Sequence, residues 1–144
     1  MPAFDEGMKL QMEEIDAIVS NEAAPTFENT IVARDESGEL LTRVSSVFYN
    51  LSSAVTNDSI KAISKEVAPL LSAHRDNISL SEGLFARVKA VYEKKDELDL
   101  DTEQMILLEK TYRNFVRGGA NLAEEQQSRF REINKELSVL SVQF

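Results

Sequence analysis

The sequence predicts an all-α protein of about six helices packed against antiparallel neighbours. Apolar residues recur every three or four positions along most of the 144 residues, which is the spacing that lines one face of an α-helix. Only five glycines and three prolines interrupt the chain. Strict alternation of apolar and polar residues never lasts for the length of a strand. Short connections between such helices favour antiparallel packing.

The first helical patterns lie on either side of Pro25. Residues 4–19 place apolar side chains on one face and charges on the other, which predicts an amphipathic helix. Pro25 disfavours helical backbone in the residue before it, and Thr26 is placed to cap the next helix. A helical pattern then covers residues 27–55. Within it, Gly38 is either a helix end or an interior glycine tolerated at a cost of about 1 kcal/mol relative to alanine.

Two further helices are predicted in the middle of the chain. Asn57 is a good cap for the pattern of residues 60–78, and Pro69 within that pattern predicts a kink. A shorter helix is predicted over residues 81–92. It gives way to a polar stretch at residues 94–99.

The next helix has clear signals at both ends. Asp101 is placed to cap an apolar pattern over residues 105–116, and Glu103 complements the helix dipole in its first turn. Gly118 and Gly119 come shortly after the last residue of the pattern. A glycine pair in this position is expected to end the helix.

The last predicted helix covers residues 122–144. Asn121 and Glu124 have the spacing of a capping box at its start. Its apolar stripe continues to Phe144 without a glycine, a proline or a basic last turn, which are the usual signals of a helix end. We therefore expect the sequence to be an excised segment of a longer chain.

The chain is acidic, with 16 lysines and arginines against 25 aspartates and glutamates and a net charge of −9. Binding to nucleic acid needs clustered cations, so nucleic acid is not an expected partner. The same charge opposes contact with an anionic membrane surface, and no apolar run approaches the ~20 residues of a membrane span. The first residues lack the basic and apolar regions of a signal peptide, which makes the cytoplasm the expected compartment.

Composition excludes several catalytic centres. Without cysteine there is no disulfide, thiolate metal site or cysteine nucleophile. A His-Glu-x-x-His zinc motif needs two histidines, whereas this chain has only His74. No Gly-x-Ser-x-Gly elbow is present for a serine nucleophile. We therefore assign no catalytic residue, no metal ligand and no cofactor to this segment, and substrate-binding residues stay unassigned.

The single histidine admits two interpretations. His74 could carry a proton or bind a ligand, with Asp76 close by in the sequence. The structural interpretation is a partly buried histidine that is hydrogen-bonded between helices. We favour it because His74 lies on an apolar stripe between Leu71 and Ile78. In a regular helix Asp76 would point away from the ring, since residues two apart do not face each other.

Other conspicuous groups are also expected to be structural. Three acidic pairs lack the spacing and glycine of a calcium loop and are expected on solvated faces: Glu13-Glu14, Asp35-Glu36 and Glu124-Glu125. The glycine pair after residue 117 lacks the residues of a phosphate-binding loop and is expected to be a turn. Most aromatic residues fall on the apolar stripes and are expected in the core: Phe48, Tyr49, Phe85, Tyr92, Tyr112, Phe115 and Phe130.

A series of short phrases, in order along the chain, resembles a known family. The first half contains Pro-Ala-Phe-Asp-Glu-Gly-Met at 2–8, Pro-Thr-Phe-Glu-Asn-Thr-Ile at 25–31, Ser-Gly-Glu-Leu-Leu at 37–41 and Val-Phe-Tyr-Asn-Leu at 47–51. The second half contains Glu-Val-Ala-Pro at 66–69, Ala-His-Arg-Asp at 73–76, Leu-Phe-Ala-Arg-Val at 84–88 and Tyr-Arg-Asn-Phe-Val-Arg-Gly-Gly-Ala-Asn-Leu at 112–122. No single phrase is a catalytic signature. Together they resemble the N-terminal region of the thimet oligopeptidase family of zinc metallopeptidases, in its peptidyl-dipeptidase branch.

The resemblance implies that residues 1–144 are the N-terminal helical segment of a longer, two-lobed helical peptidase. In that family a His-Glu-x-x-His helix and a further glutamate bind zinc far downstream, and the N-terminal helices form one wall of a deep channel. The peptidyl-dipeptidase branch releases dipeptides from the free C-terminus of oligopeptides. The implied partners are the remainder of the same polypeptide and oligopeptide substrates. Family members also have a helical stretch before the Pro-Ala-Phe phrase, which we expect to be missing here.

Three functional hypotheses stay open at this point. The leading one is a channel-wall and scaffold segment that is not catalytic by itself. The alternative is a stand-alone helical interaction module that binds a partner helix in an exposed apolar groove. The third is an enzyme that uses His74 and a carboxylate. A reading frame that continues into a zinc motif would favour the first, a stop codon after Phe144 the second, and activity lost in a His74→Ala variant the third.

Overall fold

The computed structural model describes residues 1–55 and 57–144, and over those residues the chain is all-helical, as predicted. The described residues form six long helices: α1 (Pro2–Val19), α3 (Glu39–Ala54), α4 (Asp58–Ser79), α5 (Glu82–Glu93), α6 (Thr102–Arg117) and α7 (Glu124–Gln143). Three short elements complete the order: a π-helical turn at Phe27–Val32, the single turn α2 (Ala33–Glu36) and a 3₁₀ turn at Lys95–Glu97. None of the described helices has the length and apolar character needed to cross a membrane.

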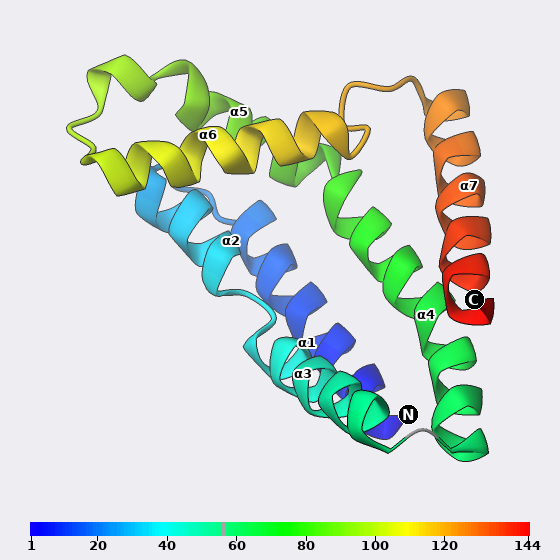
Figure 1. Cartoon of the computed structure of the whole chain (residues 1–144). Helices are drawn as coiled ribbons and strands as arrows, with labels where there is room; N and C mark the ends of the chain where they lie inside the picture. Colours follow the sequence, from blue (N-terminus) through cyan, green and yellow to red (C-terminus); the bar gives the residue numbers. More distant parts are fainter. Residues whose placement is uncertain (56) are drawn as a thin grey trace.

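The long helices are arranged as three antiparallel pairs (Figure 1). Helix α1 packs against α3, α4 packs against α7, and α5 packs against α6. In Figure 1 the α1–α3 and α4–α7 pairs approach each other at one end, while α5 and α6 lie across the other end. Helix α1 also contacts α4 and α5, so it joins the three pairs. The prediction of antiparallel neighbours is therefore confirmed.

Side-chain caps begin several helices, at Thr26, Asn57 and Asp101 as predicted and also at Ser81. Thr26, Asn57, Ser81 and Asp101 each accept a backbone N–H from three residues ahead, at 2.8 to 3.3 Å. Such bonds satisfy N–H groups that have no partner within the helix. Pro69 lies within α4, which continues on both sides of it, and the kink predicted there stays a prediction.

Gly38 is a break between helices and not an interior helical residue. It separates α2 from α3 and has a φ of 78°, a left-handed backbone conformation that residues with a Cβ rarely adopt. The Gln11 side chain occupies the space next to it, because a Cβ built on Gly38 would lie 2.3 Å from Gln11 Nε2. The structure thus decides the alternative that the sequence left open.

The predicted start of the last helix is wrong by two residues. Gly119, with a φ of 92°, makes an additional turn after α6, in which the Leu122 N–H donates to the Gly119 carbonyl at 3.0 Å. Asn121 lies within that turn, so Ala123 becomes the residue that precedes α7. Gln126, not Glu124, reaches back to accept the N–H of Ala123 at 3.2 Å.

The core has two parts that meet along α1. The larger cluster combines the second half of α1, the π-helical turn, α5 and α6, and it includes Ile15, Ile31, Leu84 and Leu108, each at most 1% exposed. The smaller cluster joins α1, α3 and α4 through Phe4, Leu41 and Val67. Helix α7 contributes no buried residue to either cluster. It lies on the outside of α4, and this leaves the face between α3 and α4 free to form a groove.

Candidate functional site

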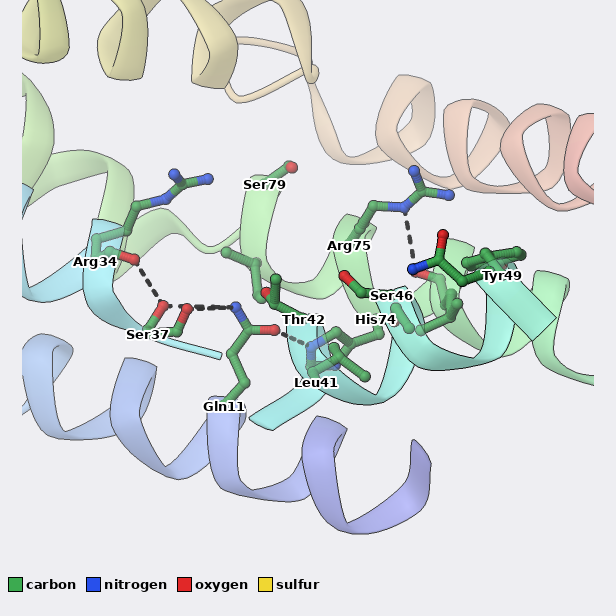
Figure 2. Close-up of a pocket in the computed structure, with 14 residues that line it drawn as sticks. Gln11, Arg34, Ser37, Leu41, Thr42, Ser46, Tyr49, His74, Arg75 and Ser79 are labelled. Carbon is green, nitrogen blue, oxygen red and sulfur yellow. Dashed lines mark hydrogen bonds between the residues drawn. The ribbon is translucent and has the colours of Figure 1, made fainter. Parts of the chain in front are cut away.

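A groove of about 710 Å³ lies between α3 and α4 (Figure 2). Residues of both helices line it, together with α1 and the segment that connects α2 to α3. The lining consists of Gln11, Arg34, Ser37, Leu41, Thr42, Ser45, Ser46, Tyr49, Asn50, Leu71, His74, Arg75, Ile78 and Ser79. We refer to this surface as the α3–α4 groove.

A chain of hydrogen bonds holds the residues at the base of the groove. His74 Nε2 lies 2.7 Å from Gln11 Oε1, and Gln11 Nε2 lies 3.4 Å from the carbonyl oxygen of Ser37. Because the Gln11 amide nitrogen faces a carbonyl, its oxygen is the acceptor and His74 Nε2 donates. The Ser37 hydroxyl in turn donates to the carbonyl of Arg34 at 2.7 Å. This chain joins α4, α1 and the α2–α3 break.

His74 has the geometry of the structural interpretation. It is 6% exposed and hydrogen-bonded between α4 and α1, and burial lowers the pKa of its imidazole. Asp76 faces the opposite side of α4, where its Oδ1 accepts a hydrogen bond from Asn134 Nδ2 of α7 at 2.8 Å. The structure therefore does not bring the imidazole and this carboxylate together, and they cannot act as a proton-transfer pair in this conformation.

The groove is positive in an acidic protein. Within the described part of the chain its lining contains Arg34, Arg75 and several hydroxyl and amide groups, but no aspartate or glutamate. A neighbouring groove has the opposite character, since it is lined by Glu14, Asp35, Glu36 and Glu39 with Arg43 as its cation. The Ser37–Gly38 break lies between these two surfaces and contributes Ser37 to both.

The acidic pairs serve as surface charges and as one backbone cap. Glu13 lies 3.9 Å from Lys9 in an exposed ion pair within α1. Glu14 Oε2 accepts the N–H of Gly38 at 2.7 Å and so fastens the α2–α3 break to α1. In the part of the chain that the structure describes, no three histidine, cysteine, aspartate or glutamate side chains gather as a metal site would require. The only histidine is bonded to Gln11, so these residues do not fit a zinc ion.

The aromatic prediction holds for some residues and fails for Tyr49. Phe85 and Phe115 are buried and stack at 6.0 Å, and Tyr92 stacks on Tyr112 at 3.9 Å. Tyr49 is 48% exposed and lines the α3–α4 groove. It follows Phe48 on α3, and consecutive helical residues point about 100° apart, so Phe48 packs against the smaller core cluster while Tyr49 points toward the groove.

Gln11, Arg34 and Arg75 are groove residues that were not predicted from the sequence. They come from three helices and are far apart in the chain, so no local spacing connects them. One signal was available in the helical pattern. Arg75 follows His74 on α4 and is exposed next to an apolar stripe. A charged residue in that position lies at the edge of the apolar face of the helix, next to whatever that face contacts.

Comparisons with known proteins give relatives for the whole chain. It is 43% identical over 143 residues to dipeptidyl carboxypeptidase of Salmonella typhimurium. It is also 26% identical over 144 residues to oligopeptidase A of Escherichia coli, and 29% identical over 147 residues to a thimet-like oligopeptidase of Dictyostelium discoideum. These matches cover 99 to 100% of this chain but 21% of each relative. No protein-family model matches the chain.

The chain thus spans about a fifth of the length of the curated relatives that it matches. The match to dipeptidyl carboxypeptidase lies in the N-terminal part of that enzyme, where the sequence phrases place it. The oligopeptidases match this chain over its full length at lower identity. Over its whole length the chain is therefore similar to the N-terminal fifth of dipeptidyl carboxypeptidase and, more distantly, to oligopeptidases of the thimet type, which confirms the resemblance inferred from its sequence.

Proposed function

We propose that this chain forms an N-terminal helical wall and scaffold of a zinc metallopeptidase that releases dipeptides from the C-terminus of oligopeptides. By itself the chain is not catalytic. The observation that carries the proposal is the 43% identity to dipeptidyl carboxypeptidase, which extends over 99% of this chain. Similarity along the entire chain is what a shared structural segment would produce.

In this proposal zinc is bound outside these 144 residues. The single histidine of the chain cannot supply a His-Glu-x-x-His motif, and its Nε2 is already hydrogen-bonded. The role of the segment is then to hold helices in place along a substrate channel. Its partners are the remainder of the same polypeptide and oligopeptides, and its expected compartment is the cytoplasm.

A chimera tests this proposal without requiring any knowledge of sequence outside the chain. The matched N-terminal stretch of the Salmonella typhimurium dipeptidyl carboxypeptidase is replaced by these 144 residues, and dipeptide release from an oligopeptide is measured. We expect the chimera to retain activity within about tenfold, because the exchanged stretches are 43% identical over their whole length. A tenfold loss corresponds to about 1.4 kcal/mol of transition-state stabilisation. Chelation should abolish the activity, and added zinc should restore it.

Two controls complete the experiment. The same enzyme without its N-terminal fifth should be inactive, and the isolated 144-residue chain should release no dipeptide. A soluble, folded chimera without activity would contradict the scaffold role. Dipeptide release by the isolated chain would contradict the claim that it is not catalytic, and the His74→Ala variant would then test His74 as its catalytic group.

A further inference from the structure

The charges around the α3–α4 groove differ from those on the rest of the molecule. The chain has 25 acidic residues, yet none of them lines this groove, whereas four line the neighbouring one. A concave surface with low-dielectric walls concentrates the field of the charges that line it. Among the described residues, the lining of the α3–α4 groove therefore presents two cations and no carboxylate to an anion.

The two arginines of the groove differ in exposure, since Arg75 is exposed and Arg34 is half-buried. Arg75 is exposed, and its Nε donates to the Leu71 carbonyl at 3.4 Å. The Arg34 guanidinium lies 5.8 Å from the centre of the Phe115 ring, and burial lowers the pKa of this group. Within residues 1–55 and 57–144 neither arginine forms an ion pair. A guanidinium matches the two oxygens of a carboxylate through paired hydrogen bonds.

The spacing of the two arginines favours an extended ligand. Figure 2 shows Arg34 and Arg75 at opposite ends of the groove, with Ser79 between them. Along α3 the lining runs from Leu41 to Asn50, which at 1.5 Å per residue is about 14 Å, or roughly four residues of extended peptide. A single phosphate would need its donors to converge on one point.

The remaining lining residues suit a peptide. Leu41, Leu71 and Ile78 offer apolar contacts, while Ser46 and Asn50 offer hydroxyl and amide groups for a peptide backbone. A volume of about 710 Å³ is typical of ligand sites that combine apolar walls with a few polar groups.

We propose that the α3–α4 groove binds an acidic peptide segment in extended form, with Arg34 and Arg75 contacting two separated carboxylates. The choice of a peptide as ligand rests on the proposed function. The groove would then select among oligopeptides by their acidic side chains.

The test measures binding to the 144-residue chain by fluorescence anisotropy. The probe is a labelled hexapeptide of alternating glutamate and alanine, and the comparison probe has glutamine in place of each glutamate. We expect the glutamate peptide to bind at least tenfold more tightly, because each charge-assisted hydrogen bond contributes about 1.5 kcal/mol or more. Raising the salt from about 0.05 to 0.5 M should weaken this binding through screening.

Three variants locate the site. Arg75→Gln removes an exposed charge, and Ser46→Glu places a carboxylate in the groove, so each should weaken the binding of the glutamate peptide about tenfold. Arg43→Gln is the matched control, since it removes an arginine from the acidic groove and should change binding less than twofold. Unchanged thermal melting of each variant shows that the fold is intact.

Each contrary result overturns the inference. Equal binding of both peptides, or unchanged binding to the Arg75→Gln variant, would exclude recognition of carboxylates at this groove. Complete displacement of the peptide by about 5 mM inorganic phosphate would indicate a simple anion site instead of a peptide site. None of these results affects the chimera. An active chimera together with no binding of the glutamate peptide at the groove would therefore remove only this inference and leave the proposed function in place.

Discussion

Arg87 shows how one buried side chain fastens an irregular segment of backbone. It lies on α5, is 9% exposed, and donates to the carbonyl oxygens of Asn21 and Ala23 at 2.9 and 3.2 Å. It also donates to Asn29 Oδ1 at 3.2 Å, while its Nε has no partner among the described atoms. A buried charge is tolerated only when hydrogen bonds replace the water it has lost. Arg87 therefore ties the α1–α2 connection to α5.

Replacing Arg87 with leucine should lower the free energy of unfolding by about 2 to 4 kcal/mol. The change removes the side-chain donor of two carbonyl oxygens and one of the three donors to Asn29 Oδ1, which also accepts from the Thr26 N–H and the Thr30 hydroxyl. Each carbonyl oxygen that stays buried and unsatisfied costs about 1 to 3 kcal/mol. Urea denaturation followed by circular dichroism measures the loss. Lys89→Leu, also on α5, is the control, because the exposed Lys89–Glu93 pair at 3.9 Å contributes little. Equal losses of unfolding free energy in both variants would show that the hydrogen bonds of Arg87 to the α1–α2 connection do not stabilise the fold.

At the scale of the helices, the close approach of α1 and α3 depends on Gly7. A Cβ built on Gly7 would lie 2.9 Å from the Cα of Leu41, closer than side-chain and backbone carbons pack. The neighbouring contacts of this pair include Phe4 against Phe48, whose rings meet edge to face at 5.5 Å. A glycine thus sets the distance between two helices that enclose the smaller core cluster.

We expect Gly7→Ala to destabilise the protein by about 1 to 3 kcal/mol, although alanine is the better helix former by about 1 kcal/mol. The packing clash and the helix propensity of alanine have opposite effects on stability, so the sign of the measured change shows which of the two is larger. Equilibrium unfolding in urea measures the change, and Ala62→Gly at an exposed position of α4 measures the helix-propensity contribution alone. A Gly7→Ala variant more stable than the parent would mean that the two helices separate without cost.

At the scale of the whole molecule, α7 exposes an apolar face. It has no buried residue, and its exposed apolar side chains are Ile133, Leu137, Val139, Leu140 and, just beyond its end, Phe144. Helix α3 similarly exposes Val47 and Leu51 at 60% and 55%. Contiguous apolar surface of this kind is typical of sites that another protein surface covers.

We expect the 144-residue chain to self-associate at high concentration through these faces and to bind a dye specific for apolar surface. Sedimentation velocity between about 5 and 500 μM measures the association. Leu137→Lys should weaken it, because a lysine cannot be buried at low cost in an apolar contact. Ile106→Lys on α6, at another exposed isoleucine, should change it little. A monomer at all concentrations that binds no dye would contradict the prediction.

Much of the helical architecture could be predicted from local signals. The apolar period and the caps at Thr26, Asn57 and Asp101 act between residues one helical turn apart, so they can be recognised without the fold. The predicted start of α7 was wrong, because the left-handed turn at Gly119 adds residues that no cap signal marks. The prediction that Tyr49 lies in the core was also wrong. The helical pattern does not distinguish which of the adjacent residues Phe48 and Tyr49 faces the core.

By itself, the sequence determined the all-helical class, the limits of most helices and the absence of a two-histidine zinc motif, because these depend on short-range spacing and on composition. Only the tertiary structure decided that Gly38 breaks a helix, that His74 bonds to Gln11 while Asp76 faces α7, and that two arginines line a groove without carboxylates. Most of those features join residues that are far apart in the chain. Their contacts depend on how helices pack, and packing is set by the burial of whole faces and not by any local pattern.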